Sequence, residues 1–260
     1  MDKTSTDPMI NLLRRIRRNM MTEKKSDLYL VYAIGEVILV VLGILIALQI
    51  DNWNENKKTS SIEQQYLLAL KEEFEFNKVE LARVLKNNQG CTDNALIISD
   101  HTGPENPEIS NEEFENLAIS AFSSEVHYNP NQGVLDEIFS SGKLGIFNND
   151  ELKFALSSWS AVLDRALWQE RTHELLRVQI VEMIRISGNI RTMTYVWGEQ
   201  YSIKPSKFKR GNLQLLNSEE YDNRVVAFIL TGRILNEQHY AKVDEEIDRI
   251  LLLIDEEIEP

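Results

Sequence analysis

One glutamate and one histidine have the spacing of a metal-binding motif. Glu170-x-x-His173 matches half of the pattern with which some helical bundles bind two iron ions. That chemistry needs a second Glu-x-x-His motif, and no glutamate stands three residues before His101, His127 or His239. We therefore predict no metal site, and we interpret Glu170 and His173 as part of a solvated helix face.

Two further features could carry nucleophilic chemistry. Ser140-x-x-Lys143 fits the nucleophile motif of penicillin-recognising enzymes, but the accompanying Ser-Asp-Asn and Lys-Thr-Gly tripeptides are missing from the sequence. A helix that ends at Gly142 explains the motif better. Cys91 is the only cysteine, so we expect it to be buried and inert. With no catalytic set, the sequence predicts neither an enzyme nor a cofactor.

The most distinctive stretch is residues 28–50, LYLVYAIGEVILVVLGILIALQI, in which Glu36 is the only charge. A run of about 20 apolar residues spans a bilayer as one helix. The alternative is a cleaved signal peptide, with an apolar core of about 7–15 residues and a small-x-small cleavage site. This run is longer and continues into Gln49–Trp53 without such a site. We therefore predict an uncleaved transmembrane helix.

Four residues of this helix form a candidate association face: Glu36, Gly43, Ala47 and Ile50. Their spacing places them on one side of an α-helix. Gly43-x-x-x-Ala47 is a pair of small residues that lets two helices approach closely, and a protonated Glu36 could hydrogen-bond across the contact. The face predicts self-association or docking to another membrane protein. The alternative is a tolerated glutamate that is protonated or extends its carboxyl group toward the membrane surface.

Charge predicts the orientation of this helix. Residues 1–27 carry a net charge of +3, whereas residues 51–260 carry −15. Basic residues beside a transmembrane helix stay in the cytoplasm. We therefore predict that the helix lies in the cytoplasmic (inner) membrane. The N-terminus is expected in the cytoplasm and the C-terminal domain in the periplasm or outside the cell. The strong negative charge of that domain argues against nucleic acid as a partner.

Helical periodicity dominates the rest of the chain, and no segment alternates convincingly with the period of a strand. The predicted helices cover residues 60–88, 110–122 (opened by a Ser110/Glu113 capping box), 134–141, 149–186 and 218–258. Residues 187–217 are the least clear, and a short extended piece is expected near Thr192–Trp197. Residues 60–88 have too few clean heptads to make a coiled coil secure.

These elements predict an all-α protein: one N-terminal transmembrane helix followed by an elongated antiparallel helical bundle. The expected domains are residues 1–27, basic and cytoplasmic; 28–50, transmembrane; and 51–260, acidic and helical. Lys204, Lys207, Lys209 and Arg210 form a basic patch in the acidic domain. The patch could contact anionic lipid, cell-wall polymer or an acidic partner, or it is simply a solvated loop.

The run YAIGEVILVVLGILIALQIDNWNE, residues 32–55, resembles the signature of a bacterial family of unknown function. Residues 129–152 resemble the same family more weakly. The resemblance implies a basic N-terminus, one transmembrane helix and an acidic helical domain, and it implies no activity.

Two functions remain open. The first is a structural or interaction protein, a scaffold or adaptor that presents a helical domain outside the membrane. The alternative is a ligand-sensing domain with a pocket between helices, which the aromatic residues Trp159, Trp168, Tyr195 and Trp197 could line.

Overall fold

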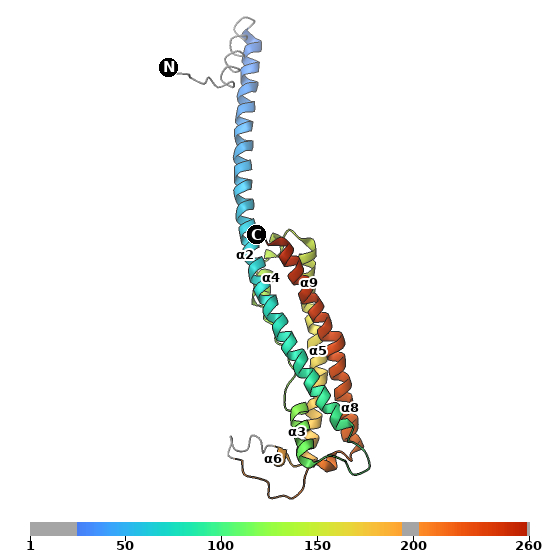
Figure 1. Cartoon of the computed structure of the whole chain (residues 1–260). Helices are drawn as coiled ribbons and strands as arrows, with labels where there is room; N and C mark the ends of the chain where they lie inside the picture. Colours follow the sequence, from blue (N-terminus) through green and yellow to red (C-terminus); the bar gives the residue numbers. More distant parts are fainter. Residues whose placement is uncertain (1–24, 194–202, 259–260) are drawn as a thin grey trace, which may run out of the picture. The chain divides into compact units, whose positions relative to one another are not determined.

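The computed structural model describes residues 25–193 and 203–258, and these are mainly helical, with no strand among them (Figure 1). The prediction of an all-α protein is therefore confirmed. The chain divides into an N-terminal unit, Met1–Ser61, and a C-terminal unit, Ile62–Pro260. The domains expected from the sequence (1–27, 28–50 and 51–260) were divided by their place relative to the membrane, and that division stays a prediction.

The first described helix, α2 (Lys25–Ser99), contributes to both units. Among the described residues it is the one helix long and apolar enough to cross a membrane, and every side chain from Leu30 to Ile50 is exposed. The predicted helix 60–88 lies inside α2. The chain leaves the helix only after Ser99, ahead of Gly103, Pro104 and Pro107, which a helix does not accommodate.

Three helical rods build the C-terminal unit: residues 62–99 of α2, α5 (Asp150–Ser187), and a continuous run of α8 (Glu219–Ile234), the π-helical segment η3 (Leu235–Tyr240) and α9 (Ala241–Glu257). The α8–η3–α9 run is antiparallel to α2, since Lys71 pairs with Asp255 at 2.7 Å and Lys78 with Asp248. Hydrogen bonds between α5 and α8 follow the same antiparallel order. The predicted antiparallel bundle is thus present, whereas a coiled coil is not shown.

Shorter elements return the chain along the bundle between α2 and α5. They are α3 (Asn111–Phe122), the extended segment 123–132, α4 (Gly133–Ser140) and the 3₁₀ turn η1 (Lys143–Ile146). Ser110 caps α3 by accepting a hydrogen bond from the Glu113 amide at 3.1 Å, as the capping box predicts. Gly142 follows α4 with a φ of 68°, a left-handed conformation that suits glycine. The Ser140-x-x-Lys143 motif therefore marks the end of a helix.

The core lies where the three rods meet, and it is rich in aromatic residues. Phe74 of α2 meets Trp159 of α5 edge-on at 5.1 Å, and Phe122 of α3 meets Phe228 of α8 at 5.2 Å. The apolar residues that recur at helical spacing along the α8–η3–α9 run are all buried: Val225, Ile229, Tyr240, Val243, Ile247, Ile250 and Ile254. Sequence periodicity therefore identified the core face of this helix.

The structure refines one local prediction and corrects another. The helix expected over residues 218–258 is present as the continuous α8–η3–α9 run, but it is π-helical rather than α-helical over Leu235–Tyr240. Leu235 and Tyr240 are both buried although five residues separate them, and the Ala241 amide accordingly bonds to the carbonyl five residues back, that of Asn236. The extended piece expected near Thr192–Trp197 is wrong for Thr192 and Met193, which lie in the short helix α6 (Ile190–Met193). The remainder of that piece falls outside the described residues.

Candidate functional site

The predicted association face lies within one uninterrupted stretch of α2. Residues 36–50 are α-helical, so Glu36, Gly43, Ala47 and Ile50 do share one side of a helix. All four are exposed, and a Cβ added at Gly43 would meet no atom within 4 Å. A second helix therefore has room to approach closely at Gly43 and Ala47. Association through this face stays a prediction.

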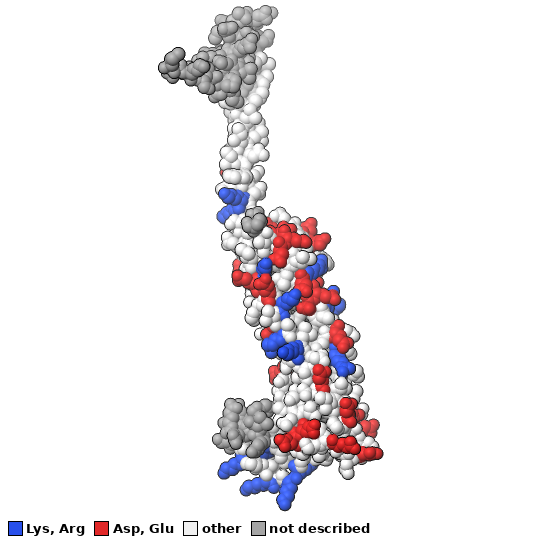
Figure 2. All heavy atoms as spheres, in the orientation of Figure 1, with Lys and Arg blue, Asp and Glu red and all other residues white. Residues whose placement is uncertain are grey.

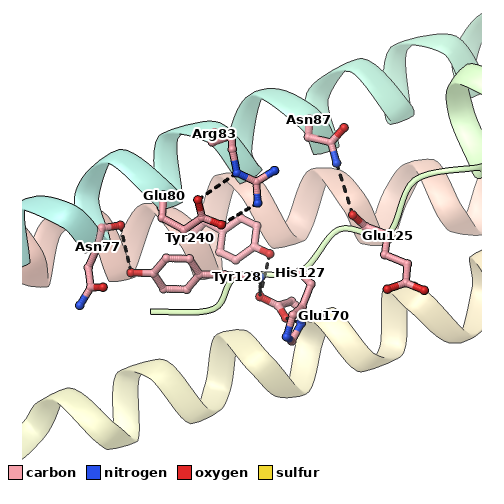
Figure 3. A network of polar contacts seen from close by, with 9 residues as sticks. All are labelled: Asn77, Glu80, Arg83, Asn87, Glu125, His127, Tyr128, Glu170 and Tyr240. Carbon is pink, nitrogen blue, oxygen red and sulfur yellow. Dashed lines mark hydrogen bonds and ion pairs between the residues drawn. The ribbon is translucent and has the colours of Figure 1, made fainter. Parts of the chain in front are cut away.

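The second candidate lies inside the C-terminal unit and centres on a buried carboxylate, Glu170, which is 3% exposed (Figure 3). Its Oε1 atom accepts hydrogen bonds from the Tyr240 hydroxyl at 2.8 Å and from the Tyr128 amide at 3.1 Å. Its Oε2 atom lies 3.1 Å from Nδ1 of His127. We call Glu170, Tyr240, Tyr128 and His127 the Glu170 cluster.

Three elements supply these side chains. Glu170 belongs to α5, Tyr240 is the last residue of η3, and His127 and Tyr128 lie in the extended segment 123–132. The Tyr128 hydroxyl also donates to the Asn77 carbonyl of α2 at 3.2 Å. The Glu170 cluster therefore ties the returning segment to all three rods of the bundle.

Burial sets the electrostatics of the Glu170 cluster. Desolvation raises the pKa of Glu170, although the hydrogen bonds from Tyr240 and Tyr128 and the nearby His127 act in the opposite direction. Desolvation also raises the pKa of the Tyr240 hydroxyl, which therefore stays protonated and acts as a donor. Since each carboxylate oxygen already has a partner, the arrangement suits holding elements together better than attacking a substrate.

The interpretation of Glu170-x-x-His173 as a solvated helix face was wrong. Both side chains point into the core, whereas Arg171 between them is exposed. The His173 ring stacks on Phe228 with centroids 4.2 Å apart, and its Nδ1 atom lies 3.0 Å from the Thr231 hydroxyl. Burial lowers the pKa of His173 to about 4, so the ring is neutral at physiological pH. Within the described residues no group of three or more metal-ligating side chains is assembled.

A close contact between rods lies beside His173, at Gly232 of α8. A Cβ at this position would come within 2.5 Å of Thr92 Cγ2 and 2.8 Å of His173 Cε1. Asn88 of α2 donates to the Gly232 carbonyl at 2.8 Å and to Asn236 Oδ1 at 2.7 Å. Asn88 therefore holds the start of the π-helical segment, as Glu170 holds its end.

Other residues singled out in the sequence are a cysteine and four aromatic residues. Cys91 is buried, as predicted, and desolvation raises the pKa of its thiol. Of the aromatic residues proposed to line a pocket, Trp159 belongs to the core and Trp168 is exposed. Tyr195 and Trp197 lie outside the described residues. Sequence reasoning missed Tyr240 and Tyr128 as polar partners, because their hydroxyls gain that role only from the packing of distant segments.

The fold and these sites define an all-α protein with one candidate membrane span among the residues that the structure describes. The chain belongs to DUF6090, a family of unknown function, whose family model matches residues 36–169. The match begins at Glu36 and ends one residue before Glu170, and it confirms the resemblance seen in the sequence. The comparisons with curated proteins and with solved structures gave no match.

Proposed function

We propose that the protein is a single-pass membrane protein that presents its helical C-terminal unit outside the cytoplasmic membrane and acts as a structural or interaction protein. The observation that carries this proposal is the run from Leu30 to Ile50, which is helical, almost wholly apolar and exposed at every side chain. So large an apolar surface is unfavourable in water and is stable when lipid or another apolar helix covers it. The lipid bilayer is therefore the first proposed partner.

The charge distribution supports the orientation. Residues 1–27 carry +3 and residues 51–260 carry −15, which favours an N-terminus inside and a C-terminal unit in the periplasm or outside the cell.

The association face supports a second partner within the membrane. Glu36 is costly to place in lipid alone, and a partner that satisfies its carboxyl group lowers that cost. Gly43 and Ala47 leave space for the backbone of a neighbouring helix on the same side. We infer that the protein associates through this face with another membrane protein or with a second copy of itself.

Crosslinking in cells tests the proposal. Tagged full-length protein is crosslinked, purified in mild detergent and examined by mass spectrometry, alongside Glu36→Ala and Gly43→Leu. Leu45→Ala, on the opposite side of the same helix, is the matched control. The proposal expects a specific partner that both face variants lose and the control keeps. Self-crosslinks alone that both face variants lose would support association with a second copy and contradict an adaptor role, and no crosslinks would contradict both.

A ligand-sensing function is the second candidate. A cavity of about 230 Å³ lies between α3, α5 and α6, lined mainly by apolar side chains that include Phe122, Ile184 and Met193, together with Arg177. This composition suits a small apolar molecule, because the Arg177 guanidinium is already paired with Glu174 at 2.6 Å. Thermal-shift screening of the full-length protein with such compounds tests it, because a bound ligand raises stability by mass action. Unchanged melting temperatures at millimolar concentrations would exclude this function.

A further inference from the structure

The basic patch seen in the sequence belongs to a loop that also exposes an aromatic ring. Residues 203–210, which we call the basic loop, contain Lys204, Lys207, Lys209 and Arg210 and no acidic residue. Phe208 stands between two of these lysines and is 82% exposed, and Ile203 at the start of the loop is also exposed. The loop therefore combines positive charge with an apolar surface.

Hydrogen bonds attach the basic loop to the bundle. Asn189 donates to the Ser206 hydroxyl at 3.1 Å and to the Arg210 carbonyl at 2.9 Å. The Phe208 amide donates to the same Ser206 hydroxyl at 3.2 Å, and the Arg210 guanidinium donates to the Ser187 carbonyl. Phe208 is thus presented to solvent by a loop that is fixed on both sides of it.

The three lysines of the loop are available to an external anion. Lys204, Lys207 and Lys209 are exposed, and none of the ion pairs between described residues includes them. Two acidic side chains of α3, Glu112 and Glu115, border the same cavity as Pro205 and Ser206. Glu115 is buried and already accepts hydrogen bonds from Asn212 and Thr192.

The basic loop lies at one end of the C-terminal unit. The chain enters this unit at Ile62, and the loop lies beside α6, at the opposite end of the rods (Figure 1). Residues 62–99 of α2 alone span about 55 Å along that direction. Lys and Arg side chains project at the α6 end, and along the rods Lys and Arg are interspersed with Asp and Glu (Figure 2). Charges more than about 8 Å apart are largely screened at physiological salt, so the acidic residues along the rods offset little of the loop's charge. The four basic residues of the loop outnumber Glu112, an exposed carboxylate at the same cavity.

We propose that the basic loop is a docking surface for an anionic lipid bilayer. Lysines near an anionic membrane surface each strengthen binding about five-fold, and an aromatic ring beside them inserts at the level of the headgroups. The exposed ring of Phe208 favours a bilayer over a soluble polyanion, since a bilayer offers an apolar region next to its negative charge and a polyanion chain does not. This inference stands apart from the proposed anchor, because it concerns only the C-terminal unit.

Vesicle flotation tests the proposal with the full-length protein held in nanodiscs of zwitterionic phosphatidylcholine. The probes are vesicles of phosphatidylcholine alone and vesicles that contain about one third phosphatidylglycerol. The loop variant is Lys204→Gln/Lys207→Gln/Lys209→Gln. The matched control, Lys78→Gln/Lys153→Gln/Lys242→Gln, removes the same charge from surface lysines of the rods.

The proposal expects flotation with the anionic vesicles only, weakened by salt. The loop variant is expected to bind on the order of 100-fold more weakly, as three lysines at about five-fold each imply. Phe208→Ala is expected to weaken binding to vesicles without changing binding to soluble polyphosphate. No flotation, equal losses in both lysine variants, or binding indifferent to Phe208 would overturn the proposal. A failure of the membrane anchor is distinguishable, because such a protein would not enter the nanodiscs.

Discussion

The Tyr240 hydroxyl donates a 2.8 Å hydrogen bond to Glu170, and this contact joins the end of the π-helical segment to the middle of α5. At the other end of that segment, Asn88 of α2 bonds to Gly232 and Asn236. The extra residue that makes η3 a π-helix is therefore held between polar contacts to two different rods. These contacts fix the register of α8 and α9 against the bundle. π-Helical segments often occur at functional sites.

Removing the Glu170 carboxylate tests this arrangement. Glu170→Ala leaves the Tyr240 hydroxyl and the Tyr128 amide without their acceptor, and we expect it to lower the free energy of unfolding by about 3 kcal/mol. Glu170→Gln retains an acceptor oxygen and is expected to cost less than about 1 kcal/mol. Urea unfolding of the full-length protein in detergent, followed by circular dichroism, measures both. Glu237→Ala, at an exposed position of η3, is the control. Equal costs for the alanine and glutamine variants would show that the acceptor is unimportant.

His173 predicts a loss of stability in mild acid. Burial lowers its pKa in the folded protein to about 4, below the usual value of 6.5. Between these values the unfolded chain binds a proton that the folded protein does not, so stability falls as pH decreases from 6.5 and levels off near 4. The full difference corresponds to about 3 kcal/mol. Unfolding free energies measured from pH 7.5 to 4 should show this fall, and His173→Phe, which keeps a ring stacked on Phe228, should remove it.

Glu170 contributes with the opposite sign over part of the same range. Its pKa is raised in the folded protein, so the folded state binds the proton more readily and stability increases as pH falls toward 4.5. Glu170→Gln removes this contribution, and its pH profile should therefore fall more steeply in acid than that of the unmodified protein. A profile that His173→Phe leaves unchanged would assign the acid sensitivity to other groups.

The sequence predicted features that depend on near neighbours in the chain. Ser110 identified a helix start because a capping side chain and its amide partner lie within three residues of each other. The burial of Glu170 and His173 could not be read in this way. Their partners Tyr240 and Thr231 are 70 and 58 residues away, and only the packed fold brings them together.

The π-helical segment did leave a trace in the sequence. Leu235 and Tyr240 are five positions apart in the sequence. Because an α-helix has 3.6 residues per turn, this spacing would place the two side chains on different sides of an α-helix. Before the fold is known, this spacing alone does not indicate a π-helical segment, because either residue could lie on the exposed side of an ordinary α-helix. Association through the face of Glu36 and Gly43 stays a prediction, because it concerns a contact with a second helix and the described residues supply only one side of that contact.

Two glycines on helices give a matched pair of substitutions. At Gly232 an added methyl group would collide with Thr92 and His173, so Gly232→Ala is expected to destabilise the protein by about 2 kcal/mol or more. At Gly90 of α2 an added Cβ meets nothing within 4 Å, and Gly90→Ala is expected to stabilise by up to about 1 kcal/mol through higher helix propensity. Thermal and urea unfolding compare them directly. Similar effects for both would contradict the close packing at Gly232.

Membrane orientation can be measured with single cysteines placed on either side of the apolar helix. Cys91 is unsuitable as a reporter, because it is buried and its thiol has a raised pKa. In a Cys91→Ala background, Ser157→Cys places an exposed thiol on α5, and Ser5→Cys places one before the span. A membrane-impermeant maleimide should label Ser157→Cys on spheroplasts and Ser5→Cys only after lysis, since basic flanking residues stay in the cytoplasm. The reverse pattern would place the C-terminal unit in the cytoplasm, and labelling of both without lysis would exclude an intact span.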